Sequence, residues 1–205
     1  MHRQFPEVPL ISISDAQRRP LWWANLRATI AHGLPGALYS IQTNPGNYLA
    51  FIGCISPEKR VDRVIEVAKR VGMPIRIAAK VDAEYFERKI KPLLGHPLVE
   101  FLGEIGEREK RELLGGAYAL LFPIDWPEPF GLVMIEALAC GTPVIAFRNG
   151  SVPEIIEDGT TGFVVTSLER PAAGPLLRNC GHRDAMSVSD NRGDAMSVSD
   201  NRETR

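Results

Sequence analysis

Two glutamates, Glu128 and Glu136, stand eight positions apart on either side of Gly131, where a run of apolar residues begins. Prolines at 127 and 129 and the glycine favour a tight turn into a helix, whose first N–H groups and positive dipole end suit a phosphate or diphosphate. A carboxylate only accepts hydrogen bonds, so each glutamate can hold two neighbouring hydroxyls, as on a sugar ring or a ribose. Alone, Glu128 could simply stabilise the helix end and Glu136 could face solvent. Their spacing around the turn indicates a binding site instead.

Other patterns that carry chemistry are missing from the sequence. No G-x-G-x-x-G follows a strand, and neither a phosphate loop ending in Gly-Lys-Ser/Thr nor a G-x-S-x-G, H-E-x-x-H or Asp-x-Asp motif occurs. The four histidines are scattered without the spacing of metal ligands, and the three cysteines lie far apart. These absences argue against a dehydrogenase, a nucleoside triphosphatase and a metal-dependent hydrolase.

The composition is that of a soluble globular protein. Of 205 residues, 44% are hydrophobic and 24% charged, and 24 Lys and Arg against 25 Asp and Glu give a net charge of −1. Without a basic surface, nucleic acid and anionic membranes are poor candidate partners. No apolar stretch reaches the ~18 residues that span a bilayer, and the first residues lack a signal-peptide core. Together with the odd number of cysteines, this favours a cytoplasmic location.

From Tyr48 onward, short apolar runs alternate with helical patterns. The expected strands are 48–53, 74–79, 98–103, 117–122, 142–147 and 162–165. The first expected helix begins at Ser56, which would be its N-cap before Pro57. Further helices are expected over 82–94, 107–114 and 131–140, with a helical turn at 152–157. This alternation predicts an α/β fold: a Rossmann-like parallel sheet with helices on both faces and a ligand crevice beyond the carboxyl ends of the strands.

The chain divides into three parts. Residues 1–46 contain a short candidate strand at 9–14 and a segment at 26–31 that could be another strand or part of a helix. Trp22 and Trp23 are expected between them as half-buried packing anchors. Turn-forming residues at 44–47 mark the boundary of a domain that we place at residues 47–166.

Residues 167–205 form a low-complexity tail with a direct repeat. DAMSVSDNR occurs at 184–192 and again at 194–202. With few large apolar residues, the tail cannot offset its ordering entropy and is expected to be disordered. A duplicated or frame-shifted end of the coding sequence is the alternative.

The segment EPFGLVMIEALACGTPVIA, residues 128–146, resembles the signature of the retaining glycosyltransferases of family 4, also called group 1, which have the GT-B fold of two facing α/β domains. FIGCISPEK, residues 51–59, looks like the first strand and phosphate loop of that family's donor domain. Residues 101–123 resemble its base-binding segment and residues 150–165 the stretch after the motif. The resemblance runs continuously over about residues 47–165, and PLISISDAQRR and ATIAHGLP look like the last acceptor-domain strand and the interdomain connection.

The resemblance implies a role for each site residue. Glu128 would hold hydroxyls of the donor sugar, Glu136 the ribose, and Lys59 would neutralise the departing phosphate, so that Lys59 and Glu128 are the candidate catalytic residues. Main-chain N–H groups of 131–133 would bind the diphosphate, and the backbone at 104–105 would meet the base. The implied donor-binding residues are Gly53, Lys59, Glu104, Ile105, Glu128, Phe130, Gly131, Leu132, Val133 and Glu136.

The implied reaction transfers a hexose from a nucleoside diphosphate sugar to an unknown acceptor, with retention at the anomeric carbon and without a metal or other cofactor. One position departs from the family pattern. Cys54 follows Gly53 where the family usually has an arginine, a second cation on the diphosphate. We expect Cys54 to be a small buried residue, and Lys80, at the end of the next strand, could partly compensate.

Only a remnant of an acceptor domain, residues 1–46, precedes the predicted donor domain. The resemblance therefore implies a truncated donor-binding half with little or no transfer activity, whose natural partner is the missing N-terminal domain. Two alternatives remain: a nucleotide-sugar-binding module without catalysis, and a GT-B-type nucleotide-sugar epimerase. The Glu-x7-Glu pair and the Ser-Pro-Glu-Lys loop argue against the epimerase.

Overall fold

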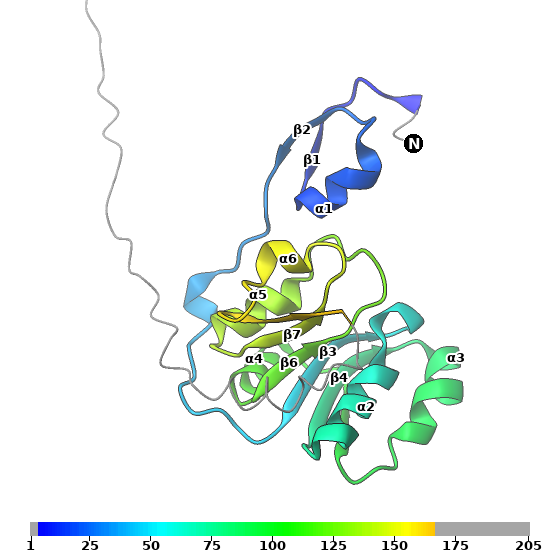
Figure 1. Cartoon of the computed structure of the whole chain (residues 1–205), viewed down its shortest axis with the longest axis vertical. Coiled ribbons are helices and arrows are strands. Elements are labelled where there is room, and N and C mark those ends of the chain that lie inside the picture. The colour runs from blue at the N-terminus through cyan, green and yellow to red at the C-terminus, as the bar shows by residue number, and fades with distance from the viewer. Residues whose placement is uncertain (1–3, 167–205) are drawn as a thin grey trace, which may run out of the picture.

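Short apolar runs of four to seven residues build the centre of the molecule as a parallel sheet. The structure, a computed structural model, describes residues 4–166, so the repeat and the rest of the predicted tail lie outside the described residues. The sheet has the order β5-β4-β3-β6-β7-β8 (Figure 1). Its strands are β3 (Leu49–Ile55), β4 (Ile75–Val81), β5 (Val99–Gly103), β6 (Ala119–Phe122), β7 (Val144–Phe147) and β8 (Gly162–Val165). The predicted Rossmann-like sheet is confirmed.

The direction of strand addition reverses between β3 and β6. From β3 the chain adds β4 and then β5 on one side, and it then returns to place β6, β7 and β8 on the other side. At such a reversal the loops leaving two neighbouring strands diverge to opposite faces and open a crevice at the carboxyl ends. The loops after β3 and β6 therefore frame the natural ligand position.

Helices cover both faces of the sheet because alternate strand residues are apolar on both sides. Leu49 and Phe51 of β3 belong to a core formed with α2 (Val61–Val71). Ala50 belongs to the opposite core, together with residues of α4 (Glu107–Gly115), α5 (Leu132–Ala139) and α6 (Val152–Ile155). Figure 1 shows α2 and α3 on one side of the sheet and α4 and α5 on the other.

The helix predicted from Ser56 does not begin there. Pro57–Lys59 form a single 3₁₀ turn, and Arg60 adopts a left-handed conformation with φ 54° before α2 begins at Val61. A left-handed residue interrupts the helical path, so the turn and the helix are separate elements. The prediction was wrong about the helix start, since the pattern of apolar residues carries no signal for the conformation of Arg60.

The helix predicted over 82–94 is also broken. It consists of α3 (Ala83–Tyr85), a π turn at Phe86–Ile90 and a 3₁₀ turn at Lys91–Leu93. Pro92 has no N–H with which to bond four residues back, so the hydrogen-bond pattern shifts around it.

The N-terminal residues form a separate small unit. The strands β1 (Leu10–Ser12) and β2 (Leu26–Thr29) pair in parallel, and α1 (Asp15–Arg18) follows β1. This confirms the strand predicted within 9–14, and of the two alternatives for 26–31 the strand is the one that forms. Trp22 is 84% exposed, so the expectation of a half-buried anchor was wrong for this residue. Strands of three and four residues offer too little apolar surface to cover it.

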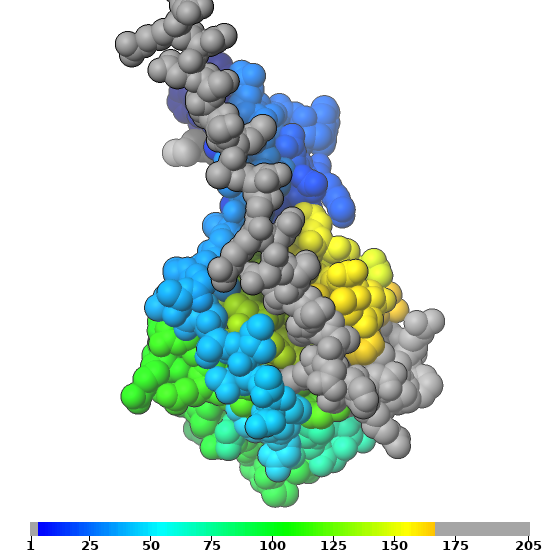
Figure 2. Space-filling view, turned by 90° about the vertical axis from the view of Figure 1, so that its left-hand side faces the viewer, coloured from blue at the N-terminus to red at the C-terminus, as the bar shows by residue number. Residues whose placement is uncertain are grey.

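A side chain of the large domain holds this unit in place. The Glu154 carboxylate of α6 accepts the main-chain N–H groups of Asp15 at 2.8 Å and Ala16 at 2.7 Å. The connecting residues then run down the surface of the large domain as the light-blue atoms of Figure 2. The N-terminal unit is therefore tied to the domain at α6 as well as through the chain.

Replacing Glu154 with alanine removes both acceptors of this contact. Since hydrogen bonds to a charged group contribute about 1.5–3 kcal/mol, we expect the amides of Asp15 and Ala16 to exchange with deuterium at least roughly tenfold faster. Hydrogen exchange read by NMR measures this directly. Glu157→Ala, at an exposed position just after α6, is the matched control. Unchanged exchange in Glu154→Ala would show that the carboxylate does not hold the unit.

Candidate functional site

The loops after β3 and β6 are fastened to each other at the point where the strand order reverses. The N–H of Asp125 donates to the main-chain oxygen of Glu58 at 2.8 Å. The Asp125 carboxylate accepts hydrogen bonds from Arg60 at 2.8 Å and from Arg63 at 3.2 Å. These contacts set the predicted phosphate loop against the loop that carries Glu128.

Glu128 and Lys59 meet across this junction. The Lys59 Nζ atom lies 2.6 Å from Glu128 Oε2, and the indole Nε1 of Trp126 donates to the same oxygen at 3.0 Å. Glu128 is only 9% exposed, and a carboxylate so deeply buried requires partners of this kind. The structure thus brings the two candidate catalytic residues into contact, although they are 69 positions apart in the chain.

The backbone of Glu128 is positioned by a second loop. The Ser151 N–H donates to the main-chain oxygen of Glu128 at 2.9 Å, and the Ser151 hydroxyl donates to that of Phe130 at 2.8 Å. Gly150, with φ +54°, packs so closely that a Cβ atom there would lie 2.2 Å from the Glu128 oxygen. Gly150 and Ser151 were missed as site residues, since only their contacts with the 128–130 loop distinguish them.

Gly131 stands directly before α5 in a conformation that requires glycine. Its φ is +78°, and a Cβ atom would lie 2.7 Å from Met134 Cε. The first N–H groups of a helix have no acceptor within the helix, so those of residues 131–133 are available to an anion. The helix start lies beside Glu128, where the sequence placed the diphosphate.

Glu136 is the second buried carboxylate, with an exposure of 8%. The Lys110 Nζ atom of α4 lies 2.8 Å from Glu136 Oε1 and 2.8 Å from Glu107, and the Tyr39 hydroxyl donates to Glu136 at 3.4 Å. Glu136 therefore does not lie on a solvated helix face. Lys110 and Tyr39 were missed because nothing in their sequence surroundings indicates contact with α5.

The charges around Glu136 shift the pKa values of its neighbours. Burial alone would lower the pKa of Lys110, but hydrogen bonds to Glu107 and Glu136 outweigh it and raise the pKa above the ordinary value. Burial and the Glu136 charge raise the pKa of Tyr39. At neutral pH, Lys110 is therefore a cation and Tyr39 a neutral hydrogen-bond donor.

The remaining predicted residues lie along the same edge of the sheet. Gly53 and Cys54 lie near the end of β3, and Cys54 is in register with Lys80 of β4, both side chains being exposed. The expectation that Cys54 is buried was wrong, because its strand position faces outward at the end of the sheet. Glu104 and Ile105 follow β5 just before α4, and no hydrogen bond within residues 4–166 joins them to either carboxylate.

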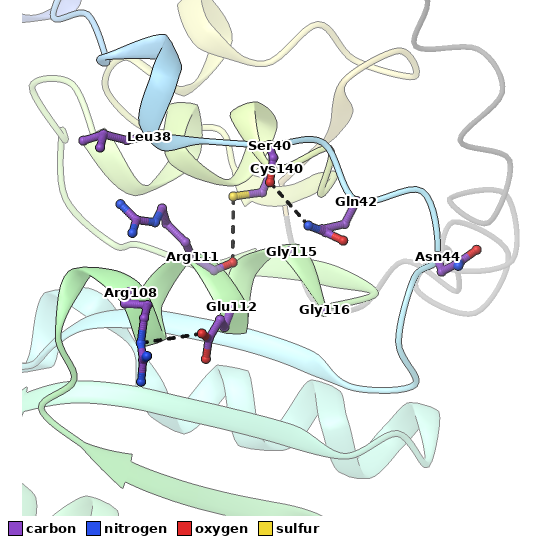
Figure 3. A pocket seen from close by; sticks show the side chains of 10 residues that line it. All are labelled: Leu38, Ser40, Gln42, Asn44, Arg108, Arg111, Glu112, Gly115, Gly116 and Cys140. Carbon is purple, nitrogen blue, oxygen red and sulfur yellow. Dashed lines mark hydrogen bonds and ion pairs between the residues drawn. The ribbon is translucent and has the colours of Figure 1, made fainter.

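A cavity of about 430 Å³ lies apart from these residues, between the linker 38–44, one face of α4 and Cys140 (Figure 3). None of the predicted site residues lines it. In the part of the chain that the structure describes, no group of three or more His, Cys, Asp or Glu side chains could hold a metal ion. No helix of residues 4–166 is long and apolar enough to cross a bilayer.

Comparison with protein families gives a match over most of this domain. The family model for glycosyl transferases group 1 matches residues 41–173, more than half of the chain. The chain belongs to the group 1 glycosyltransferase family. Its Glu128, Gly131 and Glu136 lie inside the matched range, as does Lys59.

Two individual members of the family share about a third of their aligned residues with this chain and are longer than it. The D-inositol 3-phosphate glycosyltransferase of Mycobacterium bovis (strain BCG / Pasteur 1173P2) is 33% identical over 143 residues, which is 64% of this chain and 30% of that protein. The alpha-maltose-1-phosphate synthase of Mycolicibacterium smegmatis is 29% identical over 126 residues, 57% of this chain and 32% of that protein. The chain thus covers about a third of the length of these two relatives.

Solved structures show the same fold. AviGT4, a glycosyltransferase involved in avilamycin A biosynthesis, matches with a TM-score of 0.69 and 26% identity over 82% of this chain and 53% of its own. Anabaena Alr3699/HepE, solved in complex with UDP and glucose, matches with a TM-score of 0.71 and 21% identity over 83% of this chain and 52% of its own. The family member described here spans about half of each of these structures.

The packing of Gly150 against Glu128 predicts a cost for any side chain at that position. Gly150→Ala would force the two loops apart and strain a positive φ, so we expect a loss of about 2 kcal/mol or more in the free energy of unfolding. Urea denaturation measures it. Gly95→Ala is the control, because a Cβ atom there meets nothing within 4 Å. Equal stability of the two variants would contradict the close approach.

Proposed function

We propose that the chain is the donor-binding half of a retaining glycosyltransferase, which transfers a hexose from a nucleoside diphosphate sugar to an acceptor of unknown identity. The observation that carries the proposal is the pair of buried carboxylates, each held by a lysine: Glu128, just before the N-terminus of α5, and Glu136, within α5. Such carboxylates suit hydroxyl groups, and the lysine and helix start beside Glu128 suit phosphates.

Each part of the donor has a place in this arrangement. Hydroxyls of the sugar would bind Glu128, and those of the ribose would bind Glu136. The diphosphate would lie against the N–H groups of residues 131–133, and Lys59 would turn from Glu128 toward the leaving phosphate. Positive groups aimed at the charge that develops on a leaving group lower the barrier to its departure, and here they require no metal ion.

The other predicted residues complete the donor site. The main chain at 104–105 would meet the base, since it precedes α4, which also carries Lys110 beside Glu136. Gly53 would lie under the diphosphate at the end of β3. Phe130, adjacent to Gly131 and fixed by Ser151, would line the sugar pocket.

We propose that the 205-residue chain by itself binds donor but transfers little or no sugar. An acceptor domain faces the donor domain in the GT-B fold, and in residues 4–46 the structure describes two short strands and α1. The boundaries at 46/47 and 166/167 remain predictions. Transfer by a longer polypeptide with a complete acceptor domain would distinguish an enzyme from a binding module, and interconversion of free nucleotide sugars would indicate an epimerase.

Titration calorimetry with UDP, GDP and ADP, and with a hexose conjugate of each, tests donor binding. We expect one base to be preferred. Glu136→Gln should weaken both the diphosphate and its sugar conjugate, whereas Glu128→Gln should weaken mainly the conjugate, each roughly tenfold or more. Glu157→Gln, away from the site, is the control. If the unmodified chain binds none of these nucleotides, the proposed function is wrong.

Cys54 is exposed at the position where the family usually has an arginine, so we expect the phosphate loop of this chain to lack one cation. Cys54→Arg places a guanidinium at the end of β3 beside the proposed diphosphate position, and we expect nucleoside diphosphate affinity to rise by roughly tenfold or more. Cys54→Ser, which adds no charge, is the matched control and should leave affinity unchanged. Calorimetry decides, and equal affinities of the two variants would contradict the assignment of this loop to the diphosphate.

A further inference from the structure

Trp126 touches both candidate catalytic side chains at once. Its indole Nε1 donates to Glu128 Oε2 at 3.0 Å, and the centroid of its ring lies 5.3 Å from Lys59 Nζ. One residue thus provides a hydrogen bond to the proposed sugar-binding carboxylate and an aromatic face to the proposed phosphate-binding cation.

The chemistry proposed for the site creates a difficulty that Trp126 resolves. Without ligand, Glu128 Oε2 is stabilised by Lys59, 2.6 Å away. If Lys59 turns to the diphosphate, a carboxylate that is only 9% exposed loses its cation just when it must keep a defined orientation. The remaining side-chain donor to that oxygen, among residues 4–166, is the indole N–H of Trp126.

We propose that Trp126 is a positioning residue of the donor site: its indole N–H holds Glu128 in the sugar-binding orientation while Lys59 is drawn to the diphosphate. This inference rests on the proposed function and deepens it. With this hydrogen bond, Glu128 keeps the orientation that binds the sugar without Lys59, and Lys59 is available to bind the diphosphate.

The backbone around Trp126 is fixed well enough for that role. The N–H of Glu128 donates to the main-chain oxygen of Trp126 at 2.8 Å, so the two residues are joined by both backbone and side chain. The preceding residue, Asp125, is anchored to Glu58, Arg60 and Arg63. The loop is thus anchored on both sides of Trp126, which holds its backbone where the indole reaches the carboxylate, although the side chain itself is 36% exposed.

Trp126→Phe tests the proposal because it keeps an aromatic face for Lys59 and removes the N–H together with the five-membered ring that carries it. With UDP and UDP-glucose as probes, or the corresponding pair for the base that the chain prefers, we expect calorimetric affinity for the diphosphate to stay within about twofold. Affinity for the sugar conjugate should fall roughly ten- to a hundredfold. Trp22→Phe, at an indole that is 84% exposed and far from the site in sequence, should change neither.

The ratio of the two affinities separates positioning from a general structural effect. Equal losses for diphosphate and conjugate in Trp126→Phe, or no loss for either, would overturn the positioning role while leaving donor binding intact. A chain that binds neither probe nor any other nucleotide in the panel overturns the proposed function, and this inference with it.

The indole resonance of Trp126 gives a second reading that needs no ligand. The chain has three tryptophans, so Trp126→Phe assigns the signal by its disappearance. In Lys59→Met the signal should keep its hydrogen-bonded position, since the indole still donates to Glu128. In Glu128→Ala it should move toward the position of a free indole. A resonance that moves in Lys59→Met but not in Glu128→Ala would contradict the proposed bond.

Discussion

A buried carboxylate must be paired, and two such groups determine how the elements at the carboxyl edge of this sheet come together. Glu128 forms an ion pair with Lys59 of the turn after β3, and Glu136 forms one with Lys110 of α4. Removing one partner from such a pair costs about 3–5 kcal/mol, because it leaves an uncompensated charge away from water. The Lys59–Glu128 pair adds to the contacts of Asp125 with Glu58, Arg60 and Arg63 in joining the loops after β3 and β6, and the Lys110–Glu136 pair joins α4 to α5. The same charges that suit polar ligands therefore also hold the edge of the fold in register.

The pairing also means that the charged groups proposed to bind a ligand already have partners within the protein. Both lysines are already engaged, so at the proposed donor site a phosphate would compete with a carboxylate for Lys59, and a ribose would share Glu136 with Lys110 and Tyr39. Part of any ligand interaction replaces an existing internal one, and the net gain is smaller than the number of contacts suggests. Selectivity follows from the same competition. In the proposed site, a molecule would have to offer negative charge and hydroxyls at the right separation to replace all of these internal partners.

The sequence was sufficient to predict the sheet and the central motif, because those signals are local. Apolar runs identify the strands, and Glu128, Gly131 and Glu136 lie within one turn and the helix that follows it. The break at Arg60 was not predictable, since it depends on the φ angle of a single residue. Lys110 and Tyr39 contact Glu136 across 26 and 97 positions, and Ser151 reaches Phe130 across 21. Such partners are chosen by the folded arrangement, and neither spacing nor residue type indicated them.

The contact between α6 and the N-terminal unit places unequal demands on the residues that form it. Glu154 accepts main-chain N–H groups from positions 15 and 16, and every amino acid except proline supplies such a group. The residues at 15 and 16 are consequently free to change during evolution without weakening the contact. Glu154 is the one position whose side chain these two hydrogen bonds require. In a set of related sequences, such an attachment would leave positions 15 and 16 variable and position 154 conserved.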